Sequence, residues 1–403
     1  MRNVGTPSHF TSVAPKLGHQ PALDGMRGYG IVAVLFAHAA YSTFSSFAAV
    51  VDMFFVISGF LITTLLLEED RRSGSISLRN FYTRRALRLL PMLYIVIGAT
   101  VVLIWIAVQI HGSGAEAAVP EDTTYGGLWE MTKSDAIAGS LYIYHVVHPV
   151  GIEILGNGSP EARPLIQLWS LSVEEHYYVF GVLITLFAVH KRLVTQLMVL
   201  FGGAYIAISL GRLFGHLGPR LAWYQRPDAI LLGVVLAFWN AKKPGEFSDR
   251  AKRILGYCGV AATAVFLGTV FVGTAFAKPL GIYVPFAPGE GRTLDDGLYW
   301  GEFGFTLCSL ATAVAVLALV RAPGHWLGRV LAWKPAVVLG VRSYAIYLIH
   351  VPLFFVMINT FPDQAALVAI AYLPMLALTT ELGHRYVERP LMKVKRRAAT
   401  PAR

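Results

Sequence analysis

The sequence has few charged residues and almost no cysteine. Charged side chains make up 14% of the 403 residues, whereas soluble domains carry about 25%. The two cysteines, Cys258 and Cys308, both lie in apolar runs, so we expect neither a disulfide framework nor a metal site. Residues 1–22 have no apolar core, and no cleavable signal peptide is expected. These shortages exclude an ordinary soluble, coiled-coil or disulfide-rich protein.

Long apolar runs are what the sequence has instead. Hydrophobic residues make up 55% of the chain, and the mean hydropathy is +0.55. A helix needs roughly 20 apolar residues to cross a bilayer. The predicted fold is therefore an all-α polytopic membrane helix bundle with about ten transmembrane helices, over 29–46, 51–67, 89–110, 169–190, 193–210, 228–240, 254–277, 298–320, 335–358 and 364–386. The short apolar stretch 136–150 is predicted to be re-entrant or interfacial, although an eleventh crossing is the alternative.

The distribution of basic residues predicts the orientation. The net charge is +10, and 26 of the 34 Lys and Arg residues lie in segments that share one side when the N-terminus is cytoplasmic. Because cytoplasmic loops are enriched in Lys and Arg, both termini are expected inside the cell, and nucleic acid is not an expected partner. We predict a polar N-terminal segment over 1–22, a transmembrane domain over 23–390 and a basic cytoplasmic tail over 391–403.

Two ionisable residues lie on the first predicted span. Arg27 and His38 are 11 residues apart, close to three helical turns, so they face the same way about 16 Å apart along the axis. Ionisable groups inside a membrane usually face a cavity or a partner. His38 is a candidate general base, since a histidine exchanges protons near neutral pH. The alternative is that Arg27 reaches the membrane surface and His38 makes one interhelical hydrogen bond.

A basic cluster follows the second span. Arg84, Arg85 and Arg88 fall within one turn of a predicted short amphipathic helix. Three guanidinium groups suit a phosphate-rich ligand from the cytoplasm. They serve equally well for orientation and for binding anionic lipid.

A third cluster opens the fourth span at its outer end. Ser172 and Glu175 have the spacing of a capping box. A cap does not account for Glu174 and His176 at the same depth. Two carboxylates beside a histidine also form an acid/base constellation.

Other polar residues lie near the outer mouth or at bilayer depth. Arg226 and Asp228 flank Pro227 at the start of the sixth span and can pair with each other. His350 lies in the ninth span, where a hydrogen-bonded core histidine is the alternative to a functional one.

Several stretches together carry a resemblance. They are Leu23-Asp24-Gly25-Met26-Arg27 with ten residues before His38, Asp52 to Phe60, Phe81 to Pro91, Trp169 to Glu175, Arg226-Pro227-Asp228, Ser343 to His350 and Val387-Glu388-Arg389-Pro390. In this order, over roughly 20–392, the sequence resembles the acyltransferase family 3 of integral membrane O-acyltransferases, which modify bacterial glycans and macrolide sugars.

The resemblance implies a function and its residues. It implies that activity depends on Arg27 and His38, that the loop arginines handle acyl-CoA, and that Glu174 and Glu175 belong to the site. His176 and Tyr177 stand where many relatives have Gln-Phe, and they can line the acceptor site with Arg226, Asp228 and His350.

We therefore expect an O-acyltransferase in the bacterial cytoplasmic membrane. It would move an acyl group from acyl-CoA to a hydroxyl of a carbohydrate-containing acceptor, with no bound cofactor. The alternative is a proton-coupled transporter or flippase of a glycan or lipid-linked substrate, in which the same buried groups form a proton path.

Overall fold

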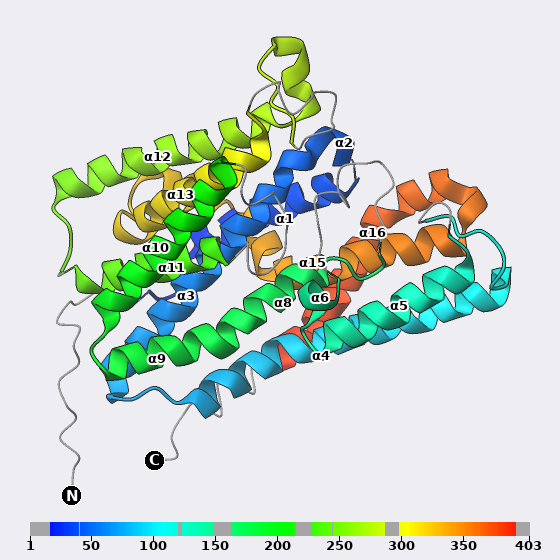
Figure 1. Ribbon diagram of the computed structural model, residues 1–403, viewed down its shortest axis with the longest axis horizontal. Coiled ribbons are helices and arrows are strands. Elements are labelled where there is room, and N and C mark those ends of the chain that lie inside the picture. The colour runs from blue at the N-terminus through cyan, green and yellow to red at the C-terminus, as the bar shows by residue number, and fades with distance from the viewer. Residues whose placement is uncertain are drawn as a thin grey trace, which may run out of the picture. The chain divides into compact units, whose positions relative to one another are not determined.

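The computed structural model describes residues 17–39, 41–119, 123–148, 163–214, 227–243, 245–286 and 298–391, and these residues fold as helices (Figure 1). Apart from one β-bridge between Glu116 and Thr124, they form no strand. The predicted all-α fold class is confirmed. The chain divides into two compact units. Unit 1 comprises Met1–Ile76 and Val173–Val341, and unit 2 comprises Ser77–Ser172 and Arg342–Arg403. The predicted boundaries at 22/23 and 390/391 stay a prediction.

Most of the helices in the described ranges belong to unit 1. Its elements are α1 (Pro21–Ala39), α2 (Tyr41–Phe44), η1 (Ser45–Ala49), α3 (Val50–Ser73), η2 (Tyr177–Gly181), α9 (Val182–His190), α10 (Val194–Leu213), α11 (Asp228–Lys242), α12 (Asp249–Val272), η3 (Ala275–Leu280), α13 (Trp300–Arg321) and α14 (Trp326–Leu331). Unit 2 contains α4 (Leu78–His111), α5 (Tyr125–Ser140), α6 (Tyr144–Val147), η4 (Pro362–Gln364), α16 (Ala365–Gly383) and η5 (His384–Glu388). Helices α8 (Leu168–His176) and α15 (Lys334–Thr360) contribute residues to both units.

Eight helices in the described ranges are long and apolar enough to cross a membrane. They are Ser45–Ser73, Leu78–His111, Leu168–His190, Val194–Leu213, Asp249–Val272, Trp300–Arg321, Lys334–Thr360 and Pro362–Leu391. Each of them overlaps one of the ten predicted spans. Residues 136–150 fall on the end of α5, on α6 and on two residues outside the described ranges, so no described helix of spanning length covers them.

The other two predicted spans, 29–46 and 228–240, do not correspond to described helices of spanning length. The predicted span 29–46 starts too late, because α1 begins eight residues earlier at Pro21; α1 is described as far as Ala39, and α2 and η1 cover Tyr41–Phe44 and Ser45–Ala49. Asp24 and Arg27 lower the hydropathy of this early part of α1, which hides its start. The span predicted at 228–240 is α11, whose 15 residues give a length of about 22 Å. That is shorter than the roughly 30 Å hydrocarbon core of a bilayer.

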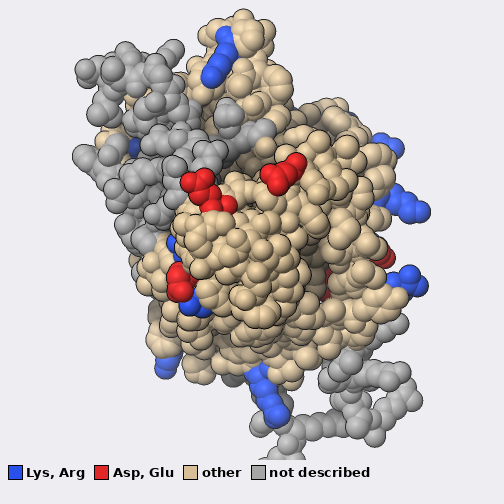
Figure 2. All heavy atoms as spheres, turned by 90° about the vertical axis from the view of Figure 1, so that its right-hand side faces the viewer, with Lys and Arg blue, Asp and Glu red and all other residues tan. Residues whose placement is uncertain are grey.

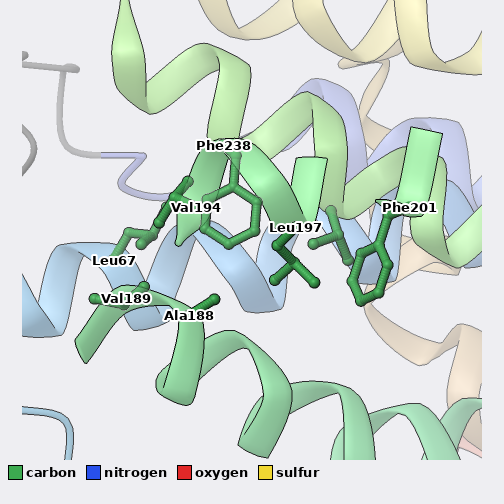
Figure 3. Close-up of a cluster of buried hydrophobic side chains, with 8 residues drawn as sticks. Leu67, Ala188, Val189, Val194, Leu197, Phe201 and Phe238 are labelled. Atoms are coloured by element: carbon green, nitrogen blue, oxygen red, sulfur yellow. The ribbon is translucent and has the colours of Figure 1, made fainter. Parts of the chain in front are cut away.

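Close backbone contact organises the centre of unit 1. A Cβ atom on Gly59 of α3 would lie 2.3 Å from Ile230 O of α11, and one on Gly233 would lie 2.3 Å from Val56 O. Only glycine permits this approach. Figure 3 shows the apolar cluster beside it, formed by Leu67, Ala188, Val189, Val194, Leu197, Phe201, Val234 and Phe238. Since the end of α3 and the end of α11 meet the start of α10 there, α3 and α11 run parallel and α10 runs antiparallel to them.

Helix α4 is the longest described helix of unit 2. It is one helix of 34 residues that begins after Ser77, whose side chain accepts a hydrogen bond from Asn80 N at 3.3 Å, and it continues through Pro91. The prediction of a separate short amphipathic helix for the arginines is therefore wrong, since Arg84 to Arg88 lie on the early turns of the spanning helix. Helix α5 packs along α4 (Figure 1).

Uncharged side chains cover most of the described surface that Figure 2 shows, and charged side chains are sparse there. Large apolar side chains such as Ile110, Val199, Leu200 and Ile370 are 62–76% exposed. In water such a surface would cause aggregation, whereas in a bilayer it contacts lipid chains.

Candidate functional site: an ionisable membrane centre

Glycines fix the position of the Arg27 turn within unit 1. A Cβ atom on Gly25 would lie 1.7 Å from Leu331 O, and one on Gly28 would lie 1.9 Å from Ala336 O. From the opposite side, a Cβ atom on Gly340 would lie 1.7 Å from Asp24 O. Helix α1 therefore meets the first turns of α15 backbone to backbone. Arg27 lies between the two contact glycines, so any larger residue at either position would move it.

His38 lies on the last turn of α1, on the same helix as Arg27, as predicted. Its Nδ1 is 3.0 Å from Val34 O. A carbonyl oxygen only accepts, so this contact requires a hydrogen on Nδ1. In the neutral ring the lone pair is then on Nε2. The side chain keeps an accessible surface. This geometry gives His38 a basic nitrogen that faces away from its own helix backbone.

Glu174, Glu175 and His176 lie on consecutive positions of α8. The predicted capping box is wrong, because α8 begins at Leu168 and Ser172 lies inside it, where its hydroxyl donates to Leu168 O at 2.9 Å. Glu174 Oε1 accepts a hydrogen bond from the Tyr178 hydroxyl. Ser172, Glu174 and Glu175 therefore do not cap the start of a helix.

The helix changes its winding immediately after these carboxylates. Tyr177–Gly181 form a π-helical segment, η2. Such segments occur frequently at functional sites. The Tyr177 hydroxyl lies 3.2 Å from Thr63 Oγ1, which ties η2 to α3. The predicted residue Tyr177 thus connects two helices of unit 1.

Asp228 has a partner that the sequence did not suggest. Arg212, on the last turn of α10, donates through Nη2 to Asp228 Oδ2 and, at 3.2 Å, to Thr306 Oγ1. Asp228 is fully buried, and Arg212 is 2% exposed. Arg226, the predicted partner, lies outside the described residues. The only signal in the sequence was an arginine just beyond the predicted span 193–210.

The predicted donor-binding arginines lie in unit 2. Arg84 and Arg85 are half-buried and Arg88 is exposed. Tyr344, at the start of the unit 2 part of α15, donates to Leu89 O on α4 at 2.7 Å. Arg342 lies two residues before this tyrosine. Its Nε binds Glu381 Oε2 at 2.8 Å, so it adds a guanidinium group at this end of unit 2.

His350 also belongs to unit 2 and is buried. Its Nδ1 lies 2.7 Å from Tyr347 O, which requires a hydrogen on Nδ1 and leaves the lone pair on Nε2. The Tyr347 hydroxyl donates to Gln167 O at 2.9 Å and lies 2.6 Å from Ser170 Oγ. His350 is thus part of a polar network that links α8 to α15.

The predicted residues therefore separate into two sets. Unit 1 holds Arg27, His38, Glu174, Glu175, His176, Tyr177 and Asp228, and unit 2 holds Arg84, Arg85, Arg88 and His350. Each unit contains a histidine whose Nδ1 donates a hydrogen bond to a backbone carbonyl, His38 in unit 1 and His350 in unit 2.

The fold and the candidate residues together describe a polytopic helical membrane protein. It has histidines bonded to backbone carbonyls and a cluster of arginines at the start of α4. The model of an acyltransferase domain matches residues 20–380, and the chain belongs to this acyltransferase family. It is a multi-pass bacterial membrane protein.

Two curated relatives illustrate the likeness. An O-acetyltransferase OatA from Staphylococcus aureus (strain NCTC 8325 / PS 47) is 29% identical over 93% of this chain and 57% of the relative. A peptidoglycan O-acetyltransferase OatA from Listeria monocytogenes serovar 1/2a (strain ATCC BAA-679 / EGD-e) is 28% identical over 93% of this chain and 56% of the relative. The chain thus spans somewhat more than half the length of these relatives. No solved structure matches the chain.

Proposed function

We propose that this protein is an O-acyltransferase that moves an acyl group from acyl-CoA to a hydroxyl of a cell-envelope carbohydrate. The family and the names of its relatives support the reaction, and the relative from Listeria supports peptidoglycan as the acceptor. We further propose that the protein lies in the cytoplasmic membrane with both termini inside the cell.

The geometry of His38 carries the proposal. Acyl transfer to an alcohol needs a group that removes the hydroxyl proton as the new bond forms. His38 Nδ1 is held by Val34 O at 3.0 Å, so the neutral ring presents Nε2 as a base. A backbone carbonyl here does what a carboxylate does in a serine hydrolase: it fixes the tautomer and the orientation of the ring.

The arginines of α4 fit the donor. Acyl-CoA carries phosphates at one end and its thioester at the other. Arg84, Arg85 and Arg88 would bind the phosphates through forked hydrogen bonds. Arg27, fixed by its glycine neighbours, would stabilise negative charge on the donor side.

The remaining residues fit the acceptor side. Glu174 or Glu175 would orient the catalytic histidine or exchange protons on the acceptor side, and Glu174 accepts a hydrogen bond from the Tyr178 hydroxyl. His176 and Tyr177 of unit 1 would line the acceptor path. Asp228 is bound to Arg212, so it would act by shaping this path rather than as a free base.

Replacement of His38 tests the proposal directly. His38→Ala, purified in detergent with radiolabelled acetyl-CoA and peptidoglycan fragments, should lose about 10²–10⁴-fold in turnover while its elution in gel filtration is unchanged. His190→Ala is the matched control, since His190 is an exposed histidine at the end of α9. Unchanged transfer by His38→Ala would refute the assignment. Substrate accumulation in vesicles without any need for acetyl-CoA would indicate a transporter instead.

Neutralising the basic cluster tests the donor site. A variant with Arg84, Arg85 and Arg88 replaced by Gln should raise the KM for acetyl-CoA at least tenfold. Its kcat at saturating donor should change far less, because the reacting groups are intact. Arg250→Gln and Arg253→Gln, at the start of α12, control for loss of basic charge elsewhere. An unchanged KM would leave the cluster with a role in membrane orientation only.

A further inference from the structure

Unit 2 contains another histidine, His148, which has a serine hydroxyl as its partner and lies apart from the residues discussed above. Ser134 Oγ of α5 is 3.1 Å from Nε2 of His148, which follows α6. Arg163 Nη2 lies 3.4 Å from the same nitrogen. The His148 and Arg163 side chains are 16% and 12% exposed. A nucleophile, a base and a cation therefore meet at one point.

A buried carboxylate holds the cation in place. Arg163 Nε donates to Asp135 Oδ1 at 2.7 Å, and Leu165 N donates to Asp135 Oδ2 at 3.2 Å. Burial alone would lower the pKa of Arg163, but the Asp135 carboxylate outweighs it and raises that pKa. Arg163 is therefore charged, and its charge is balanced by Asp135.

The protons of this cluster can be assigned from the donors around His148. Asp135 Oδ1 lies 3.5 Å from His148 Nε2 and would accept a proton on that nitrogen. Arg163 opposes this, because the guanidinium already neutralises Asp135 and directs an N–H at the same Nε2. Guanidinium groups only donate, so Nε2 is an acceptor and the Ser134 hydroxyl donates to it. This is the relation between nucleophile and base in hydroxyl-based covalent catalysis.

From this geometry we infer that Ser134 is a nucleophile that receives the acyl group as an ester, with His148 as its base. The inference rests on the proposed function, because the activated acyl group is the thioester of acyl-CoA. Unlike a Ser-His-Asp triad, the carboxylate here holds Arg163 rather than the histidine. Arg163 takes the place of an oxyanion donor and stabilises the tetrahedral intermediate.

The reaction balances with these groups. Ser134 Oγ attacks the thioester carbonyl carbon and its proton passes to His148 Nε2. The carbon–sulfur bond breaks, and the leaving thiolate takes that proton to give free CoA. An acceptor hydroxyl then attacks the carbonyl carbon of the Ser134 ester while its proton passes to His148 Nε2. The bond between that carbon and Ser134 Oγ breaks, and the released serine oxygen takes this proton from His148, which leaves the acylated acceptor and the free serine hydroxyl.

The position of Ser134 on α5 fits an elongated donor. Tyr94 OH donates to Ser140 O at 3.2 Å, and His111 stacks on Tyr125 at 4.8 Å, so α5 runs antiparallel to α4. Ser134 therefore lies alongside α4 beyond Tyr94, more than about 9 Å along the axis from Arg88. A donor bound by its phosphates at the arginines must extend along α4 to reach Ser134, as the long arm of CoA allows.

The decisive experiment traps the ester. The full-length protein in detergent is mixed with radiolabelled acetyl-CoA without acceptor, quenched in acid and digested. We expect hydroxylamine-sensitive label on the peptide that contains Ser134, identified by mass spectrometry, and its discharge when peptidoglycan fragments are added before the quench. Label on another residue, or none, overturns the inference.

Variants separate chemistry from folding. Ser134→Ala should lose the label, whereas Ser140→Ala on the same helix should keep it, and His148→Gln should slow labelling at least 10²-fold. The wild-type trap does not depend on whether these variants fold. Unlabelled wild-type protein that still acetylates glycan refutes only the Ser134 ester. Unlabelled protein that transfers nothing refutes the ester and the proposed function together.

Discussion

The ion pair between Arg212 and Asp228 makes a sharp prediction about what holds unit 1 together. The pair lies where the end of α10 meets the start of α11, and α11 is locked to α3 through Gly59 and Gly233. Asp52, fully buried near the start of α3, is close enough for its charge to act on Arg212. One guanidinium group thus faces two buried carboxylates, and the N-terminus of α11, which begins at Asp228, also favours negative charge.

The charges around Arg212 set the expected magnitude. Arg212→Gln leaves two carboxylates in an apolar interior without their cation, and breaking a buried pair in this way costs about 3–5 kcal/mol. Asp228→Asn leaves Asp52 as the carboxylate near the guanidinium group and should cost somewhat less. The double variant Arg212→Gln/Asp228→Asn places two neutral amides in contact. It should therefore be at least about 2 kcal/mol more stable than the sum of the single changes predicts.

Unfolding of the four detergent-solubilised proteins measures this coupling. Wild type, both single variants and the double variant are compared by thermal unfolding, followed through intrinsic tryptophan fluorescence. Arg250→Gln, an exposed arginine on α12, is the control and should leave the unfolding temperature within experimental error. Strictly additive losses, or an Arg212→Gln variant as stable as wild type, would show that the pair does not hold these helices together.

Three further predictions follow from single contacts. Gly233→Ala places a Cβ atom 2.3 Å from a backbone oxygen of α3 and should destabilise the protein by about 1–3 kcal/mol, whereas Gly203→Ala meets open space and should not. Burial raises the pKa of Asp135 from 3.8 to about 6 despite its guanidinium partner. The folded chain therefore binds the carboxyl proton more tightly than the unfolded chain, and the free energy of unfolding should fall by roughly 3 kcal/mol as pH rises from about 4 to 6. Asp135→Asn should remove that part of the pH dependence of thermal unfolding. Arg321 is 4% exposed and donates from its Nη2 to Asn240 O at 2.6 Å; Arg321→Gln should speed proteolytic cleavage of the connection after α11, and an unchanged cleavage rate would contradict this.

The sequence predicts the helices better than it predicts where they begin. Hydropathy finds every helix of spanning length among the described residues, because lipid-facing side chains dominate those runs. It places the start of α1 eight residues late, since Asp24, Arg27 and the glycines make that part polar and small. The glycines are there because α1 meets α15 backbone to backbone, and hydropathy carries no information about such contacts between distant segments.

The candidate site shows the same division. Histidines, carboxylates and arginines are visible in the sequence as residue types at unusual depths, so Arg27, His38 and Glu174 could be singled out. Their partners could not, because pairing depends on which helices are neighbours. Arg212 lies just beyond the predicted span 193–210, and only the antiparallel packing of α10 against α11 brings it to Asp228.

Proton position is the last property that the sequence leaves open, and it decides which histidines can act as bases. His38 and His350 each donate from Nδ1 to a backbone carbonyl of the preceding turn, whereas His148 accepts at Nε2 from Ser134 and Arg163. All three rings thus carry their lone pair on Nε2, although different neighbours impose it. A carbonyl from the same helix fixes the ring wherever that helix moves, while the contacts of His148 join α5 to Arg163 in the segment that precedes α8. Activity that depends on His148 should therefore be sensitive to changes in the packing of α5, and activity that depends on His38 should not.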